Sequence, residues 1–176
     1  METRQLLIDG AIATAGGLAG SRLMNPVTQK ISEGQTEESK RQEREASDAP
    51  AYAVAARKAA EAADVDLSET QQQKGGKFLH YALGVSWAPV YMLLRRKTRL
   101  TPWGAGTLTG SAMYALVDEV ANPLLGVTPP PTRYPAVTHL RGLAGHLVFG
   151  LTLATVVEAG WRLTGRAREL GLTTRR

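Results

Sequence analysis

The chain contains no cysteine and few aromatic residues. Its 176 residues include three Trp, five Tyr and two Phe. Without cysteine, a disulfide framework, a thiolate metal site and a cysteine nucleophile are all excluded. The length suits one compact domain and is too short for two large ones. Hydrophobic residues make up 43% of the chain and the mean hydropathy is −0.17, values that taken alone suit a soluble protein.

That average is misleading because charge is concentrated in one segment. Residues 28–77 hold 8 of the 21 Lys and Arg residues and 10 of the 16 Asp and Glu residues. Elsewhere, charge occurs in short clusters at the ends of apolar segments. The basic clusters at 95–99 and 162–176 each follow such a segment, a position typical of anchoring at anionic lipid head groups. We therefore expect a lipid bilayer, and not nucleic acid, as the partner of these residues.

Four apolar segments are predicted to span a membrane, at about 5–24, 77–96, 102–125 and 139–161. A span takes about 20 largely apolar residues, so each segment must include its flanks. The second and fourth lack the polar stripe with a 3.6-residue period that marks a surface helix. A soluble helical domain is the alternative, but it would have to bury both segments completely. Continuous apolar runs also favour helices over the strands of a barrel.

The first segment has a second interpretation, as a cleaved signal peptide. Asp9 interrupts its apolar part and Arg22 follows it, so an uncleaved span is expected.

Small residues recur at four-residue spacing in three of the segments, which places them on one helix face where backbones can approach closely. These are Gly16 with Gly20, Gly106 with Gly110, and Gly142 with His146 and Gly150. The predicted fold is an all-α integral membrane bundle of about four transmembrane helices in one domain.

The polar insert at 28–76 is predicted to lie outside the membrane. Residues 28–50 are rich in charge with almost no apolar content, which is typical of a solvated helix or a disordered stretch. An Ala-rich helix is expected at about 50–66, and its small apolar face would pack only lightly on other elements. The insert is thus a helical or disordered addition after the first span.

The distribution of Lys and Arg predicts the orientation. The connection between the second and third spans has four basic residues and no acid, and the C-terminal tail has five arginines against Glu169. Basic connections usually lie in the cytoplasm. With four spans, both termini are then cytoplasmic, whereas the insert and the Pro-rich turn face outward.

The end of the third span reads N-P-x-x-G-x-T-P-P, a second Pro follows, and G-H-L-V-F-G enters the fourth span. These features, within residues 118–150, resemble the bacterial inner-membrane family named after YagU. AGSRLMNPVTQK and HYALGVSWAPVYMLLRR look like the first two spans of its actinobacterial-type members. The similarity touches all four spans and is weakest in the charged insert. The family has no known molecular function, so the resemblance implies a membrane fold in the bacterial cytoplasmic membrane, but no reaction, cofactor or catalytic residue.

The predicted topology gathers several ionisable side chains near the outer boundary of the membrane. Such groups within a span are costly and usually face the bundle interior or water. On an ideal α-helix Asp118 and Asn122 share a face that Glu119 leaves by about 100 degrees. The alternatives for this group are an ordinary interhelical hydrogen bond or ion pair, a proton- or ion-linked function, and metal binding. The candidate polar site consists of Asp118, Glu119, Asn122, His146, His139, His80 and Arg22.

Other polar and aromatic residues are expected to have structural roles. Glu158 and Arg162 are four residues apart, which favours a local helix pair. Four aromatic residues, Trp87, Trp103, Tyr134 and Trp161, fit anchoring at the membrane interface.

No catalytic, cofactor-binding or metal-ligating set is predicted. The leading functional hypothesis is a non-enzymatic structural or accessory protein of the cell envelope. The first alternative is a small transporter linked to protons or ions, which would require a homo-oligomer because four spans are few. The second alternative is a membrane metalloenzyme.

Overall fold

The computed structural model describes residues 2–47 and 49–172, and every regular element in them is helical. This agrees with the all-α prediction. Arg175 and Arg176 of the predicted basic tail lie outside the described residues.

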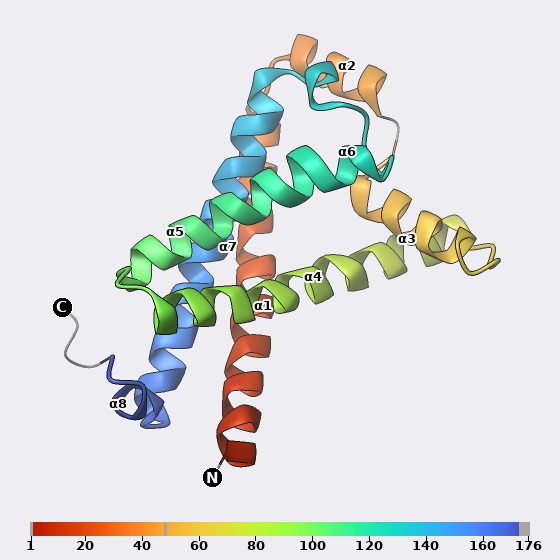
Figure 1. Cartoon of the computed structure of the whole chain (residues 1–176). Coiled ribbons are helices and arrows are strands. Elements are labelled where there is room, and N and C mark those ends of the chain that lie inside the picture. The colour runs from red at the N-terminus through yellow and green to blue at the C-terminus, as the bar shows by residue number, and fades with distance from the viewer. Residues whose placement is uncertain (1, 48, 173–176) are drawn as a thin grey trace.

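The long helices are arranged as two crossing pairs (Figure 1). Helix α1 (Glu2–Glu33) and helix α7 (Ala136–Leu163) run antiparallel along one direction. Helix α4 (Glu69–Lys97) and helix α5 (Pro102–Met113) lie across them, and α5 continues into the π-helix η1 (Tyr114–Ala121) and the short helix α6 (Asn122–Leu124). The long helices thus cross instead of all running side by side.

Glycines permit a close crossing between α5 and α7. A Cβ atom at Gly106 would lie 2.7 Å from the carbonyl oxygen of Gly150, and one at Gly110 would collide with the carbonyl oxygen of His146. Only a residue without a side chain fits at such distances from backbone atoms. The prediction of close backbone approach is confirmed for Gly106, Gly110 and Gly150, whereas Gly142 faces the ring of Tyr114.

The glycines of α1 have a similar role. A Cβ atom at Gly17 would lie 2.5 Å from the Cα atom of Val85 on α4. Gly20 faces Phe149 of α7, where an added Cβ atom would lie 2.7 Å from Cδ2 of the ring. Helix α1 therefore packs tightly on both α4 and α7.

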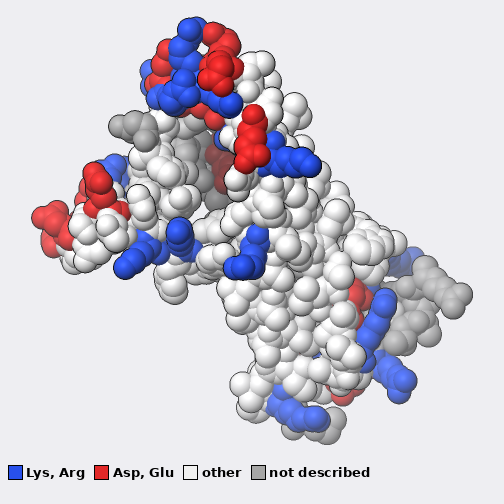
Figure 2. All heavy atoms as spheres, turned by 180° about the vertical axis from the view of Figure 1, so that it is seen from behind, with Lys and Arg blue, Asp and Glu red and all other residues white. Residues whose placement is uncertain are grey.

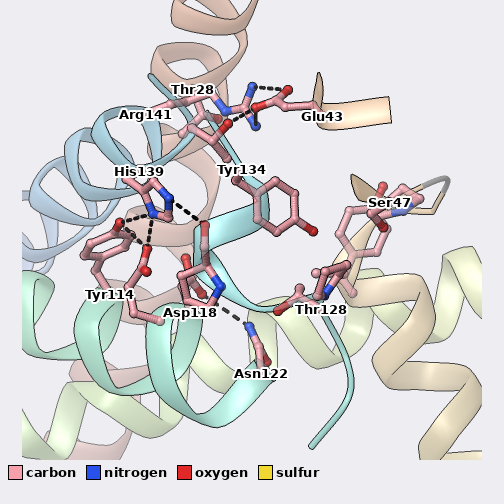
Figure 3. Close-up of a pocket in the computed structure, with 18 of the residues that line it drawn as sticks. Thr28, Glu43, Ser47, Tyr114, Asp118, Asn122, Thr128, Tyr134, His139 and Arg141 are labelled. Atoms are coloured by element: carbon pink, nitrogen blue, oxygen red, sulfur yellow. Dashed lines mark hydrogen bonds and ion pairs between the residues drawn. The ribbon is translucent and has the colours of Figure 1, made fainter. Parts of the chain in front are cut away.

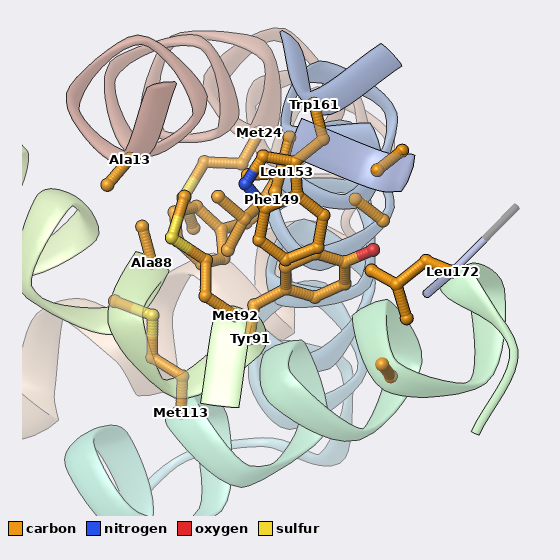
Figure 4. Packing of buried hydrophobic residues seen from close by; sticks show 14 residues of the cluster. Ala13, Met24, Ala88, Tyr91, Met92, Met113, Phe149, Leu153, Trp161 and Leu172 are labelled. Atoms are coloured by element: carbon orange, nitrogen blue, oxygen red, sulfur yellow. The ribbon is translucent and has the colours of Figure 1, made fainter. Parts of the chain in front are cut away.

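The apolar core lies among α1, α4, α5 and α7 (Figure 4). Its largest fully buried side chains are Trp161, Tyr91, Phe149, Leu153 and Val157. Trp161 is completely buried, so the prediction that it anchors the chain at a membrane interface is wrong. Its place is explained by a hydrogen bond from its indole nitrogen to Asp9, which satisfies the polar end of the ring inside the core.

The insert is helical over most of its length. It contains helix α2 (Glu37–Ala46) and helix α3 (Ala51–Glu61). Helix α3 packs on the first turns of α4 through small residues, because a Cβ atom at Gly76 would lie 2.5 Å from the carbonyl oxygen of Tyr52. Ser68 and Gln71 form a capping box that starts α4 at Glu69, well before the predicted start of the second span.

Two buried acids join the helix ends near the two termini. Asp9 of α1 accepts hydrogen bonds from Arg96 of α4 at 2.6 Å and from Arg166 at 2.8 Å. Arg166 lies in helix α8 (Arg166–Glu169), which follows α7. With the hydrogen bond from Trp161 of α7, Asp9 thus joins α1 to α4, α7 and α8 at this end of the molecule.

The second acid is Glu158 of α7. It accepts hydrogen bonds from Arg95 at 2.5 Å and from the Tyr91 hydroxyl at 3.0 Å, both on α4. The predicted local pair with Arg162 is therefore wrong, because Arg162 is exposed while the buried carboxylate faces α4. We call Asp9, Glu158 and their partners the terminal ionic network.

By length and composition alone, one helix in the described part of the chain could cross a membrane. This helix is α7, and 39% of its apolar window is buried within the protein. A core helix of a soluble protein meets the same test, so α7 alone is weak evidence for a membrane location.

Candidate functional site

A cavity of about 470 Å³ lies at the end of the molecule opposite the terminal ionic network (Figure 3). We call it the polar cavity. Its volume is within the range of small-molecule binding sites. The walls come from α1, α2, the segment before α3, the start of α3, η1, α6, the Pro-rich turn and α7. Polar and ionisable lining residues include Thr28, Glu43, Ser47, Tyr52, Tyr114, Asp118, Glu119, Asn122, Thr128, Tyr134, Thr138, His139, Arg141 and His146.

The π-helix η1 places two neighbouring acids in the same cavity. The backbone N–H of Asn122 bonds to the carbonyl oxygen of Val117, five residues back, as in a π-helix. Asp118 and Glu119 of this π-helix both line the cavity. Segments of π-helix are frequent at functional sites.

Asp118 and His146 meet across the contact between η1 and α7. Their closest side-chain atoms, Oδ2 and Nδ1, are 3.7 Å apart. The same Nδ1 lies 2.9 Å from the carbonyl oxygen of Gly142, so it must carry a proton and donate it there. Asn122 donates to Asp118 at 3.4 Å. The polar contacts of Asp118 with Asn122 and His146 are thus 3.4 Å and 3.7 Å long, and 37% of its side chain remains accessible.

Glu119 has closer partners than Asp118. Its carboxylate accepts a hydrogen bond from the Tyr114 hydroxyl and lies 2.7 Å from Nδ1 of His139. Nε2 of the same ring lies 3.1 Å from the carbonyl oxygen of Pro131. Both ring nitrogens therefore face acceptors, and both hydrogen bonds form together only when the ring carries two protons and a positive charge. In that state His139 neutralises Glu119.

A third acid at the rim of the cavity is paired with an arginine. Glu43 of α2 lies 3.0 Å from Arg141 of α7 and accepts a hydrogen bond from Thr138. Arg141 also donates to Gln35 at 2.9 Å. Burial raises the pKa of Glu43, but the hydrogen bonds from Thr138 and Gln35 and the charge of Arg141 outweigh it and hold this pKa below its ordinary value. These contacts fasten α2 to α7.

The turn that carries the Asn-Pro motif forms another part of the rim. Asn122 is the first residue of α6, and its carbonyl oxygen accepts hydrogen bonds from the backbone of Val127 at 2.8 Å and of Thr128 at 3.3 Å. Gly126 has a φ of 63°, a left-handed conformation that favours glycine. The motif thus turns the chain so that Thr128 and Pro129 line the cavity.

The structure brings together most of the predicted site residues but leaves two outside. Asp118, Glu119, Asn122, His139 and His146 line the polar cavity. His80 instead contacts the backbone oxygen of Ser21 at 3.5 Å, and Arg22 is exposed.

Sequence reasoning also missed several lining residues. Glu43 belongs to a charge-rich insert in which no pattern distinguishes it from solvated acids. Tyr134 was assigned to the membrane interface, although its position in the Pro-rich turn between the predicted site residues was a usable signal.

The described residues, 2–47 and 49–172, include no group of three or more His, Asp or Glu side chains placed to hold a metal ion. Comparison of the chain with models of protein families, with curated proteins and with solved structures found no match. The resemblance to the YagU family therefore stays a prediction.

Proposed function

We propose that this chain is a multi-pass protein of a bacterial cytoplasmic membrane, with α1, α4, α5 together with η1, and α7 in lipid. The observation that carries this proposal is the exposure of large apolar side chains on each of these elements. Soluble monomers rarely expose extensive apolar patches. On the face shown in Figure 2, a broad region without charged side chains separates charged clusters. The exposed residues include Leu6, Leu7, Leu18, Leu23, Phe78, Val90, Leu93, Trp103, Leu108, Leu116, Val120 and Leu140.

The terminal ionic network supports the same location. Ionisable groups in a membrane generally pair with one another inside a bundle. Asp9 is paired with Arg96 and Arg166, and Glu158 is paired with Arg95. These charges lower the hydropathy of α1 and α4, but in the folded protein they face other helices and not the surroundings.

The connectivity of this network also supports the proposed orientation. It joins the start of α1, the end of α4 and the segment after α7, and Arg95 donates to the carbonyl oxygen of Leu100 just before α5. All four places are predicted to be cytoplasmic by the distribution of Lys and Arg. The polar cavity then faces the outer side of the membrane.

The proposed role is that of a non-enzymatic accessory protein of the cell envelope that acts by binding at the polar cavity. The support for this role is a cavity of small-molecule size that is lined by polar groups from several separate parts of the chain. A homo-oligomer remains a prediction.

Proton- or ion-linked transport is the second candidate function. The proximity of Asp118 and His146 favours it, because it places two titratable side chains 3.7 Å apart inside the bundle. Between His146 and Glu158, however, α7 presents the fully buried Phe149 and Leu153. Transport would require this apolar layer to open. If Asp118→Asn and His146→Ala each leave pH-driven flux in proteoliposomes unchanged, transport is ruled out.

The proposed membrane location is tested by alkaline extraction of cell membranes. We expect the chain to stay in the membrane pellet, and its recovery in the supernatant would contradict the proposal. Fusions to alkaline phosphatase test the orientation. Activity is expected for a fusion at Ala46 and none for a fusion at Lys97, and the reverse result would invert the topology.

A further inference from the structure

Two of the three acids that line the polar cavity already have close partners. Glu43 pairs with Arg141 at 3.0 Å, and Glu119 lies 2.7 Å from His139. These contacts hold both acids in the walls of the cavity.

Asp118 is the exception. Among the described residues, it has no Lys or Arg within ion-pair distance. Its neighbour His146 has committed its Nδ1 proton to the carbonyl oxygen of Gly142 at 2.9 Å, and the Asn122 amide is 3.4 Å away. Asp118 therefore offers a partly accessible carboxylate that has no arginine or lysine partner.

Aromatic and apolar groups form much of the remaining lining. Three of the five tyrosines in the chain, Tyr52, Tyr114 and Tyr134, line this one cavity. In Figure 3, the ring of Tyr134 lies between the Glu43–Arg141 pair and Thr128. Faces of aromatic rings attract cations, and the attraction is stronger where water is excluded. The lining also contains Met24 and several prolines.

The lining does not suit a bare metal ion. Hard cations are held by several oxygen atoms that converge on one point. Here each of the three acids has a different partner: Glu43 contacts Arg141, Glu119 contacts His139 and Asp118 contacts His146. The described residues provide no cluster of three possible metal ligands. A volume of about 470 Å³ is also much larger than a single ion needs.

From these observations, we infer that the polar cavity binds a small organic cation, a protonated amine or a quaternary ammonium group, with Asp118 as its counter-charge. This inference rests on the proposed function, because it assigns a ligand class to the same cavity. Tyr134 contributes an aromatic surface, and the paired acids and Arg141 keep the walls in place.

Protons compete with the cation in this arrangement. A protonated Asp118 cannot act as a counter-charge, so binding weakens as the pH falls. The other titratable groups that act on Asp118 are Glu119 beside it, His146 on α7 and His80 on α4. Protonation of either histidine would add positive charge near the cavity, and this would also weaken cation binding as the pH falls.

Titration calorimetry of the purified full chain in detergent tests the inference. Choline serves as the cation, and its uncharged isostere 3,3-dimethylbutan-1-ol serves as the matched probe. We expect choline to bind, and we expect the isostere and the Asp118→Asn variant with choline each to show affinity weaker by about tenfold or more. Asp66→Asn, the same change in an exposed loop, should bind choline like the unmodified chain.

A second pair of variants keeps the test decisive if Asp118→Asn fails to fold. Tyr134→Phe retains the aromatic face and should retain choline binding, whereas Tyr134→Leu should weaken it. Absence of choline binding to the unmodified chain, or equal binding of choline and the isostere, would overturn the inference. Calorimetry tests the ligand class, and alkaline extraction tests the membrane location. Because the two measurements are independent, failure of one proposal can be told apart from failure of the other.

Discussion

Arg95 of α4 and Glu158 of α7 are joined across the core by a 2.5 Å contact between Nε and Oε1. Both side chains are almost fully buried, and Tyr91 donates a further hydrogen bond to the same carboxylate oxygen. A buried charge that loses its partner is strongly destabilising, whereas replacement of both partners by apolar groups is often tolerated. This pair is therefore a sensitive point of the fold.

Glu158→Leu is expected to lower the free energy of unfolding by about 3–5 kcal/mol, because it leaves Arg95 buried without a partner. The double variant Arg95→Met/Glu158→Leu should recover a large part of that loss. Arg162→Met changes an exposed residue one turn away and should alter stability by less than about 0.5 kcal/mol. Unfolding in detergent measures all three, and equal losses for Glu158→Leu and Arg162→Met would contradict the observed pairing.

The crossing of α5 and α7 should tolerate no side chain at Gly110. Gly110→Ala places a Cβ atom against the backbone of His146 and is expected to cost about 1–3 kcal/mol of stability through overpacking. Gly10→Ala is the matched control, because nothing lies within 4 Å of a Cβ atom there. In a helix, alanine at that open position should be neutral or stabilising by up to about 1 kcal/mol. Similar melting temperatures for the two variants would show that the helices are not in close contact.

The Glu43–Arg141 pair should make stability depend on acid pH. The pKa of Glu43 is lowered in the folded state, so its contribution is present above the unfolded pKa of about 4.3 and is lost as the pH falls through the lower folded value. Glu43→Gln should be less stable at neutral pH and lose less on acidification. Melting temperatures between pH 7 and pH 3 measure this difference. Glu45→Gln, on the exposed side of α2, should follow the unmodified chain, and a parallel curve for Glu43→Gln would contradict the pairing.

The sequence predicted the helical class and the small-residue contacts because both depend on local patterns. The spacing of Gly106 and Gly110 places them on one face in any helix, so their close approach to α7 follows. The position of Asp118 near His146 followed from the order and direction of the predicted spans.

The remaining features depend on tertiary structure. Glu158 has Arg162 at helical spacing, but the fold offers Arg95 at a buried position, and the buried partner determines the pairing. Glu119 lines the cavity from the π-helix η1, and no periodic pattern in the sequence indicates a π-helix. Trp161 has the composition of an interface anchor but is buried because Asp9 accepts its N–H.

The central claim, that lipid surrounds the exposed apolar faces, can be tested in a chain that is naturally free of cysteine. Single cysteines at Leu93 and Leu116, both more than half exposed, would face lipid, whereas one at Glu61 in α3 would face water outside the cell. The measurement is labelling of intact cells with a charged, membrane-impermeant maleimide. We predict rapid labelling at position 61 and none at positions 93 and 116 until the membrane is dissolved and the chain denatured. Equal labelling at all three positions in membranes that remain intact would contradict the account.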